Sequence, residues 1–118
     1  MKAIRGAITV SANTATAIGE ATTTLLSALR ERNSLRMDEV VSVFFTLTPD
    51  LDADFPARAA RDSGWDVPML DMVELNVPGA LSCCLRVLVH VNRTGPIKHA
   101  YLRGAEQLRP DLESKAHE

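Results

Sequence analysis

The chain has 118 residues, 46% of them hydrophobic, and a formal net charge of −2. A chain of this length supports one hydrophobic core, so we expect a single domain over residues 1–118. The balanced charge excludes a global basic field of the kind that attracts nucleic acid or an anionic membrane surface. At the N-terminus Lys2 and Arg5 interrupt a short apolar run, which predicts neither a signal peptide nor a membrane span and favours the cytoplasm.

The first third of the chain predicts a strand followed by a helix. Residues 2–10 alternate between two faces, and Arg5 falls on the less apolar one. Asn13 or Thr14 can cap a helix that runs to about Arg32 and carries apolar residues at helical spacing. Because the other side of this helix is polar, we expect it to cover one face of a sheet.

A second strand, a short helix and a third strand are expected next. Residues 40–48 are β-branched and aromatic, and residues 67–73 also predict a strand. Residues 55–64 predict a helix of about two turns, begun by a proline and ended by a glycine. Arg58 and Arg61 share a face of that helix. Taken alone, they are explained more simply as cations that favour the helix dipole.

The most informative stretch is residues 85–91, which predict a strand with aliphatic residues at every odd position. Arg86 lies on the other face, between apolar neighbours, in what resembles an interior strand. A buried charge without a partner costs several kcal/mol, so Arg86 is a candidate ligand-binding residue. An edge strand whose arginine reaches water is an equally supported alternative. Residues 99–103 predict a last short strand.

The sequence contains none of the usual catalytic apparatus. His90, His99 and His117 have no metal-ligand spacing, no Ser or Cys lies in a nucleophile motif, and no glycine-rich loop is available to hold a nucleotide. We therefore predict no metal and no cofactor. Arginine stays charged when desolvated and binds carboxylates through two parallel hydrogen bonds, so convergent arginines would suit a small dicarboxylate. The candidates on structured elements are Arg5, Arg58, Arg61, Arg86 and Arg109.

Several segments occur in the same order and spacing as in one known family. They are residues 4–10, 48–51, 55–61, 85–87, 99–102 and 108–112. On these segments the chain resembles the monofunctional chorismate mutases of the AroH class, over essentially its whole length. The resemblance implies an α+β fold: a mixed five-stranded sheet with one long and one short helix. It further implies a pseudo-α/β-barrel homotrimer of the chorismate mutase/YjgF-like type, with active sites between subunits.

The resemblance also implies an isomerase of aromatic amino-acid biosynthesis that converts chorismate to prephenate by a Claisen rearrangement. Such a catalyst holds the dicarboxylate in its compact diaxial form and stabilises charge as the ether bond stretches. By position, Arg86 would face the ether oxygen, Arg5 would bind a carboxylate, and Glu74 would accept from the ring hydroxyl. The other substrate-binding positions implied are Tyr101, Phe55, Ala57, Arg58, Arg61, Met69, Leu70, Asp71 and Arg109.

The same resemblance divides the site between subunits. Residues 55–61 would come from the neighbouring subunit, and the chain around Arg109 would fold over as a lid, whereas residues 113–118 predict a flexible tail. Asp71 departs from the family, which usually has a small or weakly polar residue there. Because a carboxylate opposes a dianion, we expect Asp71 to weaken substrate binding. Strict alternation puts Asp71 and Glu74 on opposite faces, so the strand must end or twist between them.

Two alternatives stay open on the sequence. One is an imine deaminase resembling the YjgF group, which also holds a carboxylate with arginine. The other is a non-catalytic trimer that binds an aromatic-pathway acid. Arg5, Glu74 and Tyr101 together favour the mutase, whereas Asp71 favours a catalytically silent relative.

Overall fold

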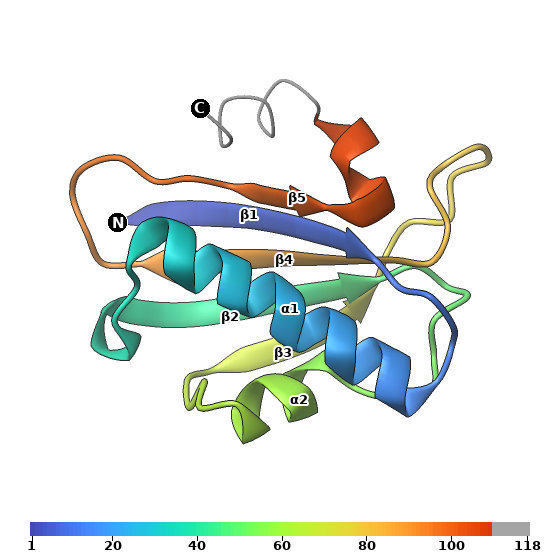
Figure 1. Ribbon diagram of the computed structural model, residues 1–118, viewed down its shortest axis with the longest axis horizontal. Helices are drawn as coiled ribbons and strands as arrows, with labels where there is room; N and C mark the ends of the chain where they lie inside the picture. Colours follow the sequence, from blue (N-terminus) through green and yellow to red (C-terminus); the bar gives the residue numbers. More distant parts are fainter. Residues whose placement is uncertain (110–118) are drawn as a thin grey trace.

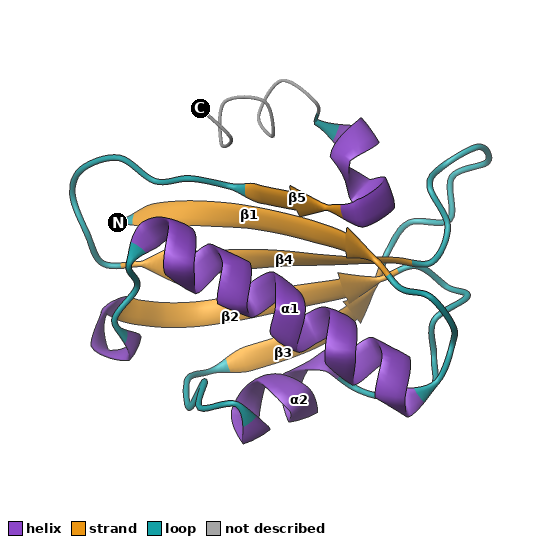
Figure 2. Ribbon diagram, viewed as in Figure 1, coloured by secondary structure: helices purple, strands orange, loops and turns teal. Residues whose placement is uncertain are grey.

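The computed structural model describes residues 1–109, which form one mixed sheet covered by helices (Figures 1 and 2). The elements are β1 (Lys2–Thr9), α1 (Ala15–Asn33), η1 (Met37–Glu39), β2 (Val40–Leu47), α2 (Pro56–Asp62), β3 (Met69–Val73), β4 (Cys84–Val91), β5 (Ala100–Leu102) and η2 (Arg103–Leu108). The predicted α+β class and mixed five-stranded sheet are confirmed. Residues 113–118, predicted as a tail, lie outside the described residues. Within residues 1–109, no helix is long and apolar enough to cross a membrane.

The strand that carries Arg86 lies in the centre of the sheet. The strand order is β3-β2-β4-β1-β5, and β4 pairs antiparallel with both β1 and β2 (Figure 1). The outer strands β5 and β3 pair parallel with β1 and β2. Hydrogen bonding on both sides of β4 makes the edge-strand interpretation of Arg86 wrong, so alternation within a paired strand decides where this side chain points.

Both α-helices lie on one face of the sheet, as Figure 2 shows. The side chain of Thr14 caps α1 by accepting a hydrogen bond from the Ala17 N–H at 3.0 Å. From there α1 packs its apolar stripe, including Leu25 and Leu29, against the aliphatic face of the strands. A Cβ added to Gly6 would lie only 3.0 Å from Leu25 Cδ1, so this glycine lets the helix approach β1 closely.

The opposite face of the sheet, here called the open face, is largely free of helical cover. Within residues 1–109, η2 packs on it through a small cluster of Ala7, Cys84, Tyr101 and Ala105, to which Leu81 and Leu108 add. The side chains that alternate away from α1 therefore project from β1, β2 and β4 into an uncovered region beside η2. This region is where a ligand can reach the sheet.

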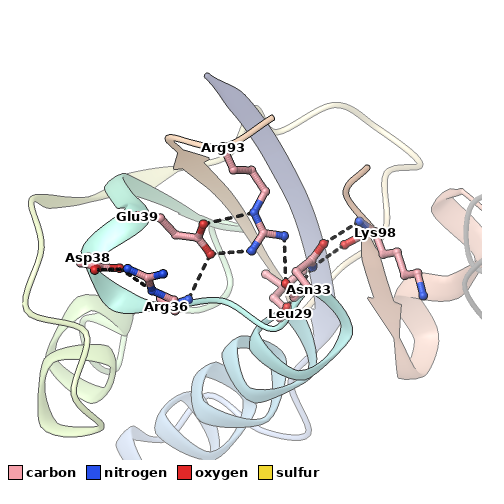
Figure 3. Close-up of polar contacts among 7 residues, drawn as sticks. All are labelled: Leu29, Asn33, Arg36, Asp38, Glu39, Arg93 and Lys98. Carbon is pink, nitrogen blue, oxygen red and sulfur yellow. Dashed lines mark hydrogen bonds and ion pairs between the residues drawn. The ribbon is translucent and has the colours of Figure 1, made fainter. Parts of the chain in front are cut away.

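A polar network at the C-terminal end of α1, here called the clamp, consists of Asn33, Glu39, Arg93 and Lys98 (Figure 3). Arg93 donates two hydrogen bonds to the Glu39 carboxylate, at 2.5 and 3.2 Å, and one to the Asn33 carbonyl at 2.8 Å. The Asn33 side chain bonds both the N–H and the carbonyl of Lys98, at 2.7 and 2.8 Å. The clamp thus fixes the segment that leads into β5 against α1.

Candidate active site

A pocket of about 330 Å³ lies on the open face, over the middle of the sheet. Its walls come from all five strands or the residues that follow them, which is why segments distant in the sequence meet there. The lining residues are Arg5, Gly6, Phe44, Thr46, Met72, Glu74, Arg86, Val87, Leu88 and Tyr101. Four of the residues predicted from the sequence, Arg5, Glu74, Arg86 and Tyr101, therefore share one pocket.

Strand register brings the two arginines of this pocket together. Arg86 on β4 pairs with Ala7 on β1 and with Thr46 on β2, so small side chains flank it on both sides. Arg5 pairs with Leu88, two residues from Arg86, and is therefore its diagonal neighbour on the same face. The result is a pair of guanidinium groups above a floor of short side chains.

Glu74 enters the pocket from the end of β3. Its N–H donates to the Leu47 carbonyl at 2.8 Å, which continues the pairing with β2 one residue beyond the strand. Its Oε1 lies 4.0 Å from the Nε of Arg86, with the two side chains 26% and 48% exposed. The pair is loose and partly open to water. Two cations and one carboxylate leave the pocket with a net positive charge, which suits a small dianion.

The remaining predicted residues gather elsewhere in the chain. Phe55, Arg58 and Asp71 line a second pocket of about 440 Å³ between α2 and β3. There Arg58 forms an ion pair with Asp54 at 3.6 Å and stacks over the Phe55 ring at 5.8 Å. Ala57 is buried beneath them. Within one chain, this group and the open-face pocket do not merge.

Asp71 faces α2 and not the open-face pocket. Its Oδ1 accepts a hydrogen bond from the Ala57 N–H at 3.1 Å, in the first turn of α2. Burial raises the pKa of the Asp71 carboxyl, with the Ala57 N–H and the Arg61 charge opposing the rise. β3 ends at Val73, but the Glu74 N–H continues its pairing with β2, so Asp71 and Glu74 lie on opposite faces as alternation requires and no break is needed to place them. The effect of Asp71 on substrate binding stays a prediction.

Three further predicted residues lie around these two groups. Met69 is half-buried at the start of β3, and Leu70, which pairs with Phe44, is exposed on the open face. Arg109 follows η2 and lies close enough to His99 for its charge to act on that ring. None of the three is among the residues that line the open-face pocket.

Sequence reasoning missed the wall that β2 and β3 contribute, made of Phe44, Thr46 and Met72. The Thr46 hydroxyl is buried and has no hydrogen-bond partner within residues 1–109. A buried hydroxyl without a partner is unfavourable, so its place beside the pocket makes it available to a ligand. The two-residue alternation of residues 42–46 carried the signal, but only knowledge that β2 borders β4 places Thr46 next to Arg86.

Comparison with known proteins gives consistent results. A family model described as chorismate mutase type I matches residues 1–112. The AroH chorismate mutase of Thermus thermophilus is 46% identical over 97% of this chain and 98% of its own length. That of Bacillus subtilis is 42% identical over 95% and 92%. A solved chorismate mutase structure from Clostridium thermocellum superposes with a TM-score of 0.88 and 49% identity, covering 91% of this chain and 99% of that one.

The chain belongs to the chorismate mutase type I family. Membership confirms the resemblance drawn from the six sequence segments and the prediction of an isomerase with chorismate mutase activity. The deaminase and non-catalytic alternatives are not supported. As a chorismate mutase, the chain presents its central arginine from the middle of a sheet, where pairing on both sides fixes the backbone beneath it.

Proposed function

We propose that the open-face pocket is where this chorismate mutase converts chorismate to prephenate, with Arg86, Arg5 and Glu74 as catalytic residues and Tyr101 as a substrate ligand. The observation that carries the proposal is the pairing of two guanidinium groups and one carboxylate around a floor of small side chains. Chorismate has two carboxylates and a ring hydroxyl, and this set of groups is complementary to it.

The proposed mechanism follows from the chemistry of a unimolecular rearrangement. One ether C–O bond breaks while one C–C bond forms within the same molecule, and no proton or electron leaves it. The pocket contributes by holding the compact diaxial conformer and by placing donors where negative charge develops. Arg86 would donate to the ether oxygen, and a preorganised donor of this kind contributes about 3–4 kcal/mol to the transition state.

Arg5 and Tyr101 would bind the carboxylates, and Glu74 would accept a hydrogen bond from the ring hydroxyl. The loose 4.0 Å contact between Glu74 and Arg86 supports these separate roles, because neither group is committed to a tight ion pair. No metal or cofactor takes part in this scheme.

We further propose that the chain assembles as a homotrimer whose neighbouring subunit completes each site with Phe55, Ala57, Arg58 and Arg61. The support is an apolar edge on the outer strand of the sheet. Leu70, Met72, Val73, Leu75 and Val77 are all exposed along β3 and the segment after it. Large exposed apolar side chains on an unpaired edge strand are typical of an interface. Met69, Leu70 and Asp71 on this edge, and Arg109 near η2, would then approach substrate from the rim.

The activity test follows chorismate absorbance with purified protein after dialysis against a chelator, and identifies prephenate as the product. We expect a rate far above the buffer rate without any added cofactor. Folded protein that gives no acceleration over buffer contradicts the assignment of this pocket as an active site.

The shared site is tested by subunit mixing. Homotrimers of Arg86→Ala and of Arg61→Ala each carry a lesion at every site. If the two arginines come from different subunits, mixed trimers contain some interfaces with no mutation, so activity reappears on co-refolding. Mixed trimers verified by mass spectrometry but no more active than their parents would exclude the cross-subunit arrangement. Co-refolding each variant with itself is the control.

A further inference from the structure

One side chain outside the pocket connects the clamp to Arg5. The backbone N–H of Arg5 donates to Nδ1 of His99 at 2.9 Å. His99 comes just before β5, whose first residue, Ala100, pairs with Gly6 of β1. In a parallel ladder the acceptor at this point is normally a backbone carbonyl of the neighbouring strand. Here the His99 imidazole is the acceptor instead, and the donor is the backbone N–H of Arg5, a residue of the proposed active site.

We propose that neutral His99 is a positioning residue that holds Arg5 in place for substrate binding, and that its protonation releases Arg5. The inference rests on the proposed role of Arg5 in the open-face pocket. His99 is absent from the residues that line the pocket, so it acts through Arg5 and not on the substrate.

The backbone of His99 is fixed from the other side. The Arg32 guanidinium donates to the His99 carbonyl at 3.1 Å, and the adjacent Lys98 is bonded through both backbone groups to Asn33 of the clamp (Figure 3). The clamp therefore sets the position of His99 relative to α1. The hydrogen bond between the imidazole and the Arg5 N–H then sets the position of β1 relative to this segment. Without the ring, Arg5 has lost the acceptor that ties it to this rigid segment.

The same contact aligns two groups of the pocket at once. Tyr101 pairs with Ala7 in the register that follows Gly6 and Ala100. A shift of Arg5 against β5 would therefore change the distance between the Arg5 guanidinium and the Tyr101 hydroxyl. Because these groups would hold carboxylates, substrate affinity is expected to fall more than the rate of the bound complex.

The contact needs the tautomer with Nδ1 free of a proton. Once protonated, both ring nitrogens of His99 are donors, and Nδ1 opposes the Arg5 N–H. Within residues 1–109, the charged groups that neighbour His99 are the cations Arg5 on β1, Arg32 on α1, the adjacent Lys98, and Arg109 after η2. Burial, followed by the charges of Arg5 and Arg109, lowers the pKa of His99 below its usual value of about 6.5.

The expected pH dependence follows from that direction. Near neutral pH His99 is neutral and the Arg5 contact is intact. As pH falls through the lowered pKa of His99 in the free enzyme, the ring gains a proton and kcat/KM decreases. This ratio reports the ionisation of groups in the free enzyme. The substrate carboxylates have much lower pKa values and stay ionised through that range.

The test compares His99→Asn with His99→Ala, because the Asn Oδ1 can replace the Nδ1 acceptor but does not titrate. For His99→Ala we expect KM to rise by up to about tenfold, as for the loss of one backbone-to-side-chain hydrogen bond, with a smaller change in kcat. His99→Asn should keep KM within a few-fold of the parent at neutral pH and lose the decrease of kcat/KM that the parent shows below pH 6.5. His90→Asn is the matched control, a half-buried histidine on β4 that should leave the acid decrease unchanged.

A second readout does not depend on activity. In nitrogen-15 NMR of the imidazoles, His99 should show an unprotonated, hydrogen-bonded Nδ1 and a pKa below that of free histidine. A His99 ring that titrates at or above its ordinary value overturns the proposal even if the enzyme is active. So does a folded His99→Ala variant with parental KM, or a His99→Asn variant with the parental acid decrease. If chorismate mutase activity is absent altogether, the NMR result still decides the role of His99.

Discussion

Two arginine–glutamate pairs in this chain use the same chemical groups in opposite ways. In the clamp, Arg93 and Glu39 meet through two hydrogen bonds of 2.5 and 3.2 Å, and their side chains are 19% and 16% exposed. In the open-face pocket, Arg86 and Glu74 approach only to 4.0 Å and are 48% and 26% exposed. Bidentate, sheltered pairs stabilise a fold, whereas loose exposed ones contribute little to it.

The partners around each pair explain the difference. Glu39 also accepts from the backbone of Arg36, and Arg93 donates to the Asn33 carbonyl, so the clamp satisfies its donors and acceptors internally. Arg86 instead lies between two short side chains and lines a pocket. The groups of the clamp form their hydrogen bonds within the protein, whereas Arg86 and Glu74 are loosely paired and can bond to a ligand. Substitutions in the two pairs should therefore act on different properties.

The largest effect is expected at Arg86. Changing Arg86→Ala should lower kcat/KM about a hundredfold or more, because a donor to the developing charge is lost. The melting temperature should change little, since the contact to Glu74 is loose. Steady-state kinetics and thermal unfolding measure the two quantities. Arg86→Lys keeps the charge without the planar guanidinium and is the control. Its kcat/KM should fall between that of the parent and that of Arg86→Ala. Parental activity in a folded Arg86→Ala protein would mean that this arginine has no part in catalysis.

Arg93→Ala should show the reverse pattern. Removing Arg93 takes two hydrogen bonds from the sheltered Glu39 carboxylate and one from the Asn33 carbonyl, which we expect to lower the free energy of unfolding by about 2 kcal/mol. At a temperature where the variant is folded, kcat should stay close to that of the parent. Urea unfolding gives the stability. Arg36→Ala is the matched control with a much smaller loss, because the exposed Arg36 side chain pairs with Asp38 and its backbone N–H to Glu39 is kept. Equal losses in the free energy of unfolding for Arg93→Ala and Arg36→Ala would contradict the stabilising role given to the clamp.

The clamp should also appear in the pH dependence of stability. The hydrogen bonds from Arg93 lower the pKa of Glu39 below its ordinary value of 4.5, and the Arg36 N–H adds to the effect. The unfolded chain therefore takes up the proton first, and the stabilisation is lost as pH falls below 4.5 through the folded pKa. Urea unfolding of the parent and of Glu39→Gln should diverge above that range and converge below it. Parallel curves would show that Glu39 does not contribute in this way.

The comparison also shows what the sequence could and could not predict. Alternation alone placed Arg5 and Arg86 on the polar side of their strands, and the structure confirms that both line one pocket. The clamp joins Glu39 to Arg93, which are 54 residues apart, and no local pattern links two such positions. The Arg5–His99 contact spans 94 residues and is equally invisible in the sequence. Both depend on strand order, which periodicity does not determine.

Asp71 is the residue for which the structure changes the question most. The sequence suggested only a negative charge near a dianionic substrate. In the structure its Oδ1 accepts a hydrogen bond from the Ala57 N–H at the start of α2, on the face away from Arg86. Asp71 therefore combines a stabilising contact to the helix with a charge that is unfavourable where it lies. Two substitutions separate these effects, since Asn keeps an acceptor without the charge and Ala removes both.

Asp71→Ala should lower the free energy of unfolding by about 1 kcal/mol, as for the loss of a helix-capping acceptor. Asp71→Asn should be slightly more stable than the parent at neutral pH. Burial raises the pKa of Asp71, so the folded state binds its proton more tightly and the ionised form costs stability as pH rises through that pKa. Kinetics at low salt decide the remaining point. If the Asp71 charge reaches the substrate of a neighbouring subunit, KM falls for both variants and the difference from the parent shrinks with added salt. If KM is unchanged in both, Asp71 serves α2 alone, and its charge does not weaken substrate binding.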